Sequence, residues 1–279
     1  MNISDIISQD IELPTLSTTS LNLVKLMGQS EPDIDEFVKV VQYDPALTAR
    51  VLKLSNSGFF GMAQGISTLQ DSVMTIGILR LLQIVMAVDT SDIFKNYSED
   101  LYYCYGQTPE DLWKDSVGVA LASNNINKRL CISSSGLSFI GGLLHDVGKP
   151  LLAAHARNHF QEIKSNAQSN KISLIQSEKS VLGINHLEVG SALLRNWELP
   201  EEIITIVENC KQPTFFDPPD SILVHFALGI VSELESEEHN FNRIDSTFKK
   251  KFSLDDEDLV DICDETLEEM SEIVESLFF

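Results

Sequence analysis

The sequence is poor in basic residues. It has 20 Lys and Arg against 42 Asp and Glu, which gives a formal net charge of −22. A chain this acidic is repelled by nucleic acid and by an anionic membrane surface, so we expect neither as a partner. Acids that only keep the surface soluble are the simpler interpretation of this charge, although it also suits a basic protein partner.

The sequence also lacks a membrane span, a targeting segment and a cysteine framework. Its longest strongly apolar stretch, residues 81–88, is too short to cross a bilayer. The N-terminus carries acids and no basic region, which argues against a signal peptide. No CxxC pair occurs, which predicts reduced thiols rather than a zinc ribbon. We therefore expect a cytoplasmic protein whose free thiols are Cys104, Cys131, Cys210 and Cys263.

The alternating pattern of β-strands is scarce, and helix signals replace it. Asp44 before Pro45 is typical of a helix N-cap with proline in the first turn. Asn185 followed by Glu188 is typical of a capping box. With 43% hydrophobic residues in 279 positions, the chain can bury a large core. We expect an all-α fold.

Changes in composition divide the chain into three regions. Residues 1–100 form an N-terminal helical layer, residues 101–215 form the central core, and residues 216–279 form a C-terminal helical section. No Lys or Arg follows Lys251, and acids then alternate with apolar residues at helical spacing. This pattern predicts an acidic amphipathic C-terminal helix that packs on the domain, with Leu259, Ile262, Met270, Ile273 and Leu277 on its apolar side.

One short run carries chemistry. His145 and Asp146 are adjacent at the end of an apolar stretch, and Gly148 and Lys149 follow. A histidine nitrogen and a carboxylate oxygen suit Mn, Fe, Mg or Zn, so this pair could be half of a metal site. A structural interpretation is equally open. His145 could bond to a backbone carbonyl, and Asp146 could cap a helix or pair with Lys149.

Several further motifs occur in a fixed order around this run. Together they resemble the HDOD family, the HD-related output domain of bacterial signalling proteins, over residues 13 to 215. The resemblance implies an all-α, HD-like multi-helix bundle in a cytoplasmic regulatory protein. Relatives often carry receiver or cyclic-dinucleotide enzyme domains, which are not visible here, so we expect a stand-alone copy. The motifs lie at residues 13–16, 43–52, 54–61, 66–69, 76–77, 113–116, 142–149, 186–190 and 197–200.

The resemblance also provides a test for catalysis. HD hydrolases hold a metal through an upstream His, the His-Asp pair and a distant Asp. In this chain Asp115 stands where the upstream His is expected, and Lys211 stands where many relatives carry a His pair. The distant Asp is replaced by an apolar residue in the segment 225–229, and the GYP motif of cyclic-di-GMP phosphodiesterases is absent. We therefore name no catalytic residue and expect a vestigial site that holds at most a weakly bound divalent metal.

Other polar residues near these motifs are weaker candidates for binding. Asn56 and Ser57 belong to the HDOD signature, but a helix cap and turn is the simpler role for them. Lys149 and His186 are candidate binding residues, and His186 follows a predicted N-cap. His155 and His159 are spaced to share one helix face, which we interpret as a surface pair and not a zinc site.

The sequence favours a regulatory, non-catalytic protein that binds a protein partner or a small signalling ligand. One alternative is a metal-dependent phosphohydrolase acting on nucleotides or cyclic dinucleotides, with His145 and Asp146 as ligands and a metal-bound hydroxide as the nucleophile. Asp115 is a further candidate ligand, since an Asp can bind metal at the position of the upstream His. A second alternative is an acidic scaffold whose C-terminal helix docks a basic partner.

Overall fold

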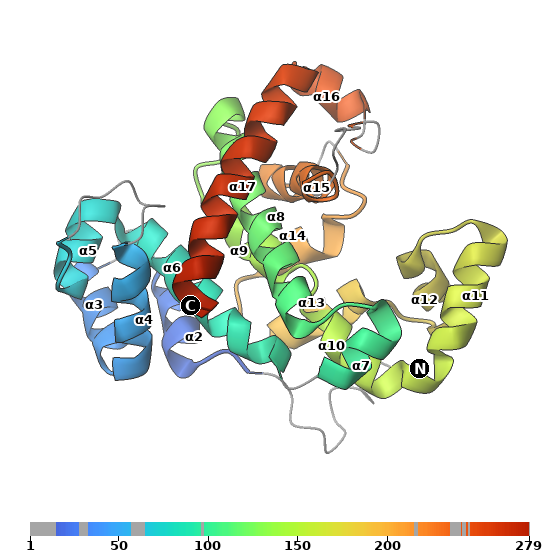
Figure 1. The fold of residues 1–279 in the computed structure, drawn as a ribbon, viewed down its shortest axis with the longest axis horizontal. Helices are drawn as coiled ribbons and strands as arrows, with labels where there is room; N and C mark the ends of the chain where they lie inside the picture. The colour runs from blue at the N-terminus through green and yellow to red at the C-terminus, as the bar shows by residue number, and fades with distance from the viewer. Residues whose placement is uncertain are drawn as a thin grey trace.

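The computed structural model describes residues 15–27, 33–56, 65–95, 98–214, 217–234, 241, 244 and 246–278. Every regular element in these ranges is a helix, and none of them contains a strand. The all-α prediction is therefore confirmed. Figure 1 shows the helices arranged as an N-terminal group at one end, a central group around α8, and a third group at the other end.

The N-terminal layer forms as its caps predict. Asp44 accepts a hydrogen bond from the backbone N–H of Leu47 at 2.9 Å and so caps α4, with Pro45 in the first turn. Residues 81–88 are all buried, so the apolar run is the core face of a packed helix. The layer consists of α2 (Thr18–Met27), α3 (Ile34–Gln42), α4 (Pro45–Ser55), α5 (Leu69–Ile76) and α6 (Ile78–Lys95).

The central group is built around one long buried helix, α8 (Pro109–Leu130). It packs against α6, α9, α15 and α17, and the indole N–H of Trp113 donates to the carbonyl of Ala87 at 3.0 Å. These contacts join the N-terminal layer to the rest of the core. Helices α9 (Leu137–Leu144) and α15 (Pro219–Val231) pack on α8, and α14 (Glu201–Asn209) packs on α9 and α15. Helix α7 (Ser98–Tyr105) packs instead on α10 (Gly148–Ala156) of the third group.

The third group carries the segment after the His-Asp run. Helix α10 packs on α13, and α11 packs on α12 (Figure 1). Asn185 and Glu188 form the predicted capping box at the start of α13. The members are α10 (Gly148–Ala156), the 3₁₀ turn η2 (Arg157–His159), α11 (Phe160–Asn170), α12 (Leu174–Leu182) and α13 (His186–Asn196).

The C-terminal section ends in the predicted acidic helix. Helix α17 (Asp256–Phe278) runs along α8 and follows the short helix α16 (Ser246–Phe252) (Figure 1). Leu259 and Ile262 are fully buried, and Arg129 of α8 pairs with Glu265 at 3.3 Å. The prediction of an amphipathic helix packed on the domain is therefore confirmed, and the side chain of Leu277 lies outside the described part of the chain.

Among the described residues, no individual helix has the length and apolar character needed to cross a membrane. Taken together, α5 and α6 pass the same test as a pair bent by 119°.

Candidate functional site

The His-Asp run lies in the turn between α9 and α10. Helix α9 is almost wholly apolar and buried, and it ends at Leu144. The backbone N–H of Val147 bonds to the carbonyl of Leu144, and that of Lys149 bonds to the carbonyl of Asp146, at 3.1 and 2.9 Å. This tight turn holds His145 and Asp146 inside the protein, with 2% and 3% of their surfaces exposed.

Gly148 brings a second helix to this turn. A Cβ atom at this position would overlap the backbone carbonyl oxygen of His186 and lie 2.5 Å from the backbone nitrogen of Gly190. Only glycine allows the start of α10 to approach the backbone of α13 this closely. The crossing carries the His186 side chain to Asp146.

The carboxylate of Asp146 contacts the side chains of Lys149 and His145. Its Oδ2 atom lies 2.6 Å from Lys149 Nζ and 3.1 Å from His145 Nε2. Burial acts to raise the pKa of Asp146, but the charges of His145, Lys149 and Lys211 outweigh it and hold the pKa well below the usual value. Asp146 is therefore an ionised carboxylate whose Oδ2 atom already has partners.

His145 adopts the structural role that the sequence left open. Its Nδ1–H donates to the carbonyl of Gly142 at 2.7 Å, so its Nε2 faces Asp146. The pairing of Asp146 with Lys149, the other structural interpretation, is also confirmed.

His186 extends the cluster to two further helices. Its Nδ1–H donates to Glu178 Oε2 at 2.7 Å, and Tyr105 OH donates to Glu178 Oε1 at 2.9 Å. His186 Nε2 points at Asp146 Oδ1 from 3.5 Å, and neither of these buried atoms has a hydrogen-bond partner. Burial lowers the pKa of His186, but Glu178 and Asp146 more than offset this, and the net shift is upward.

Asp115 is joined to the cluster through Gln107. Its Oδ2 atom accepts a hydrogen bond from Gln107 Nε2 at 2.7 Å, and Gln107 Oε1 accepts one from Lys149 Nζ at 3.1 Å. Burial raises the pKa of Asp115. Gln107 therefore connects Asp115 to the lysine and not to a metal position.

The side chains present do not fit a catalytic metal. Such a site needs about three protein ligands and an open position. Within the part of the chain that the structure describes, no three His, Cys, Asp or Glu side chains form a group that could hold a metal ion. The ammonium group of Lys149 already contacts Asp146, and the segment 226–227 of α15 supplies only apolar side chains. Weak metal binding at His145, Asp146 and Asp115 stays a prediction.

The sequence of the chain decides its family. The family model of the HDOD domain matches residues 13–213, which is most of the chain. This chain belongs to the HDOD family. A curated relative, an uncharacterized protein of Treponema pallidum, is 21% identical over 196 residues. That match covers 70% of this chain and 37% of the relative, so the chain corresponds to well under half of the relative's length.

Solved structures show the same HDOD fold. An HDOD domain protein of unknown function from Geobacter sulfurreducens is 22% identical with a TM-score of 0.76, and 99% of this chain and 97% of that chain are covered. A candidate phosphohydrolase from Shewanella amazonensis is 19% identical with a TM-score of 0.74, over 98% and 97%. A candidate signal transduction protein from Marinobacter aquaeolei is 21% identical with a TM-score of 0.75, over 100% of this chain and 61% of that chain.

Three members of the polar cluster were not predicted from the HDOD sequence. Tyr105, Gln107 and Glu178 belong to no motif, and each reaches the cluster from a different part of the chain. A polar residue on an otherwise apolar helix face is the sequence pattern that could have indicated them. Glu178, which is fully buried, shows this pattern most clearly.

Asn56 in this HDOD domain joins the end of α4 to the backbone of residues 65 and 66. Its Nδ2 donates to the carbonyls of Leu52 and Ile66, both at 2.8 Å, and its Oδ1 accepts from the backbone of Gly65 and Ile66. The predicted cap role is confirmed by these bonds. Ser57 lies outside the described residues.

The predicted pairing of His155 and His159 on one helix is wrong. Helix α10 ends at Ala156, and the chain continues as the 3₁₀ turn η2. His155 Nδ1 donates instead to the carbonyl of Leu151 at 2.9 Å. The two histidines therefore do not share a face.

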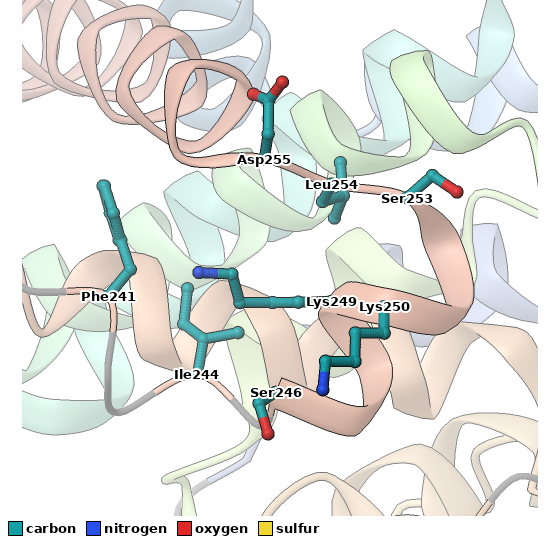
Figure 2. Close-up of a pocket in the computed structure, with 8 residues that line it drawn as sticks. All are labelled: Phe241, Ile244, Ser246, Lys249, Lys250, Ser253, Leu254 and Asp255. Carbon is teal, nitrogen blue, oxygen red and sulfur yellow. The ribbon is translucent and has the colours of Figure 1, made fainter.

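A pocket of about 480 Å³ lies in the C-terminal section, outside the residues that the HDOD family matches. Figure 2 shows Lys249 extending across it toward Phe241. Lys249 Nζ also pairs with Asp256 at 2.7 Å. The pocket shares no residue with the His145–Asp146 cluster, and it is lined by Phe241, Ile244, Ser246, Lys249, Lys250, Ser253, Leu254 and Asp255.

Proposed function

We propose that this HDOD protein is a non-catalytic regulatory module of bacterial signal transduction, which binds a protein partner or a small signalling ligand in the cytoplasm. One observation carries the proposal: Asp146, the carboxylate that would anchor a metal, has Lys149 Nζ at 2.6 Å. An ammonium group at that oxygen neutralises the carboxylate, so the charge that would attract a divalent ion is already balanced.

The relatives support a signalling role by likeness of family and fold. One structural neighbour is described as a candidate signal transduction protein. The fold itself hosts different functions, so the argument against catalysis depends on the side chains at the site.

The test is a search for metal-dependent turnover. Purified protein is freed of metal with a chelator and supplied with Mn²⁺. It is then assayed on p-nitrophenyl phosphate, bis-p-nitrophenyl phosphate and cyclic di-GMP, alongside Asp146→Asn and the exposed control Asp264→Asn. We expect the same background rate from all three proteins. Turnover that is lost in Asp146→Asn and kept in Asp264→Asn would overturn the proposal.

A second candidate function is a metal-dependent phosphohydrolase. The observation that favours it is the buried pair Asp146 Oδ1 and His186 Nε2, which point at each other without hydrogen-bond partners. A metal-bound hydroxide would be its nucleophile. One structural neighbour is described as a candidate phosphohydrolase. The same assay decides between the two functions.

The acidic scaffold is a third possibility, which the exposed face of α17 favours. Because α17 also buries Leu259 and Ile262, deleting it would disturb the core. A better test is a charge reversal of the exposed Asp264, Glu268 and Glu275 to Lys, with recovery of a basic partner as the readout. Unchanged recovery rules out this face as the docking site.

A further inference from the structure

The pocket of the C-terminal section combines buried apolar side chains with two lysines (Figure 2). We propose that it binds a small organic anion that has an apolar body and one phosphate or carboxylate group. The body lies on Phe241, Ile244 and Leu254, and the charged group lies beside Lys249 and Lys250. This inference rests on the proposed function, because it gives the small ligand of that function a place and a chemical class.

The pocket has the size and the apolar lining that such a molecule needs. Its volume is about 480 Å³, within the range of roughly 300 to 1,000 Å³ that is usual for small-molecule sites. Phe241, Ile244 and Leu254 line it, and all three belong to the buried core, which holds the lining in place. Burial of a ligand's apolar body against these side chains supplies the part of the affinity that has no direction.

Positive charge is concentrated at this pocket in a chain that has little of it. Lys249, Lys250 and Lys251 are the last three basic residues of a chain with a net charge of −22. The first two line the pocket, and Asp255 is the single acid among its described lining residues. The Asp255 carboxylate accepts from the backbone N–H of Asp258 at 2.9 Å and points away from the lysines (Figure 2). Because the acidic surface elsewhere repels anions, a local group of cations is the place where one can bind.

The two lining lysines differ in how they are held. The side chain of Lys249 is 21% exposed, and its Nζ pairs with Asp256 Oδ1 at 2.7 Å. Lys250 is exposed and forms no hydrogen bond or ion pair with any residue that the structure describes. Lys250 therefore offers an unpaired charge to a ligand, whereas Asp256, whose side chain is 77% exposed, competes with a ligand for Lys249.

The position of these lysines in α16 has a second explanation. They lie in the last turn of the helix, where cations stabilise the carbonyl end. That role involves neither a ligand nor the apolar lining. Lys53 is the lysine that separates the two explanations, because it is exposed in the last turn of α4 and does not line this pocket.

The experiment measures binding by isothermal titration calorimetry in EDTA, which prevents metal-dependent hydrolysis of the probes. The probes are 1-naphthyl phosphate, 1-naphthoate and the uncharged 1-naphthamide, whose rigid body loses little conformational entropy on binding. Inorganic phosphate tests the charged group without the apolar body.

Two pocket variants change the affinity in opposite directions. Lys250→Met removes a charge from the pocket, and Lys53→Met is its matched control. Asp256→Asn releases Lys249 from its partner. Glu257→Gln, which removes an exposed acid at the next position of α17, is the matched control for that change.

We expect the wild type to bind one molecule of at least one naphthyl anion, and to bind 1-naphthamide and inorganic phosphate much more weakly. Lys250→Met should weaken the binding about fivefold, and Asp256→Asn should strengthen it to a similar extent. Both control variants should behave as the wild type does. The anion that binds more tightly identifies the charged group. Failure of both anions to bind, binding of 1-naphthamide as tight as theirs, or equal effects of Lys250→Met and Lys53→Met would overturn the inference.

Failure of this inference is distinguishable from failure of the proposed function. Asp146 does not line the pocket, so turnover that depends on Asp146 removes the proposed function and leaves binding of 1-naphthyl phosphate unchanged. Absence of binding removes this inference and leaves the proposed function with a protein partner. Because Lys250 is exposed, Lys250→Met should melt at the wild-type temperature, and Lys250→Gln replaces it if it does not.

Discussion

At the scale of single residues, Gly148 sets the distance between α10 and α13. We expect Gly148→Ala to lower the free energy of unfolding by more than about 3 kcal/mol, because the added methyl meets backbone atoms that cannot rotate away. Gly190→Ala is the matched control at the same crossing. Its Cβ would lie 3.3 Å from Gly148 N, so its loss should be clearly smaller. Urea unfolding followed by circular dichroism measures both, and equal losses would contradict the prediction.

His186 gives the cluster a pH dependence of known sign. Its pKa lies above the ordinary 6.5 because Glu178 and Asp146 outweigh the effect of burial, and Tyr105 closes the other side of Glu178. The folded state therefore binds the proton more tightly than the unfolded chain does. The resulting stabilisation is complete below about pH 6.5 and is lost as pH rises through the raised pKa.

The comparison that isolates this effect is between the wild type and His186→Gln. We expect the wild-type advantage in melting temperature to be largest near pH 6 and to shrink toward about pH 9. An advantage that grows with pH, or does not change, would contradict the assignment.

The sequence predicts the local part of this cluster and misses the tertiary part. The bonds of His145 to Gly142 and of Asp146 to Lys149 span three residues each, so spacing alone suggests them. Tyr105 and Glu178 are 73 positions apart, and their hydrogen bond depends on how α7 meets α12. A single sequence carries no record of that contact.

At the scale of elements, the N-cap residue of α9 has no side chain that could cap the helix. Gly136 stands at its N-cap, and the carboxylate of Asp220 fills the role from the start of α15. Asp220 accepts from the backbone N–H of Ser138 at 3.0 Å and from the hydroxyls of Ser133 and Ser135. The helix that presents His145 is therefore held by a residue 82 positions away.

We expect Asp220→Ala to lower the free energy of unfolding by about 2 kcal/mol, because it leaves the buried backbone N–H of Ser138 without its acceptor. The exposed Asp264→Ala should change it by less than about 0.5 kcal/mol. Chemical unfolding of the two variants side by side gives the difference. Equal stabilities would show that water replaces the carboxylate.

The sequence predicts a helix boundary correctly where the capping residue is next to the helix in the chain. The prediction fails where the cap comes from another element. Asp44 and Asn185 cap the helices that the sequence assigns to them. The helical spacing of His155 and His159 was misleading because the chain changes to a 3₁₀ turn at Arg157. No proline or glycine marks this change in the sequence. Asp220 could not be assigned to α9 because its partner lies in another element.

At the scale of the whole molecule, burial sorts the four cysteines. Burial raises the pKa values of Cys104, Cys210 and Cys263 to about 12, whereas Cys131 is exposed. Thiolate is the reactive form, so the native protein should show one fast thiol with Ellman's reagent and all four after denaturation. A second fast thiol in the native protein would contradict the packing of the core, and Cys131→Ser should remove the fast phase.

The global fold follows from composition and order more securely than the site does. Few segments alternate between polar and apolar residues, and helix-cap patterns are frequent, so the sequence predicts an all-α chain. The helical spacing of apolar residues after Lys251 predicts the packed α17. The division at residues 100 and 215 stays a prediction, and α7 itself runs from Ser98 to Tyr105. Which helices cross at the turn after α9 is a property of the assembled core, and it depends on distances that no local pattern encodes.

The close crossing of α10 and α13 bears on how such sequences diverge. Gly148 permits the crossing, and beside it Lys149 balances the charge of Asp146 while His145 contacts the same carboxylate. A substitution of Gly148 disturbs this packing whether or not a reaction takes place beside it. A requirement for folding alone can therefore preserve the His-Asp run in a protein that hydrolyses nothing. The run is better evidence of common descent than of catalytic activity.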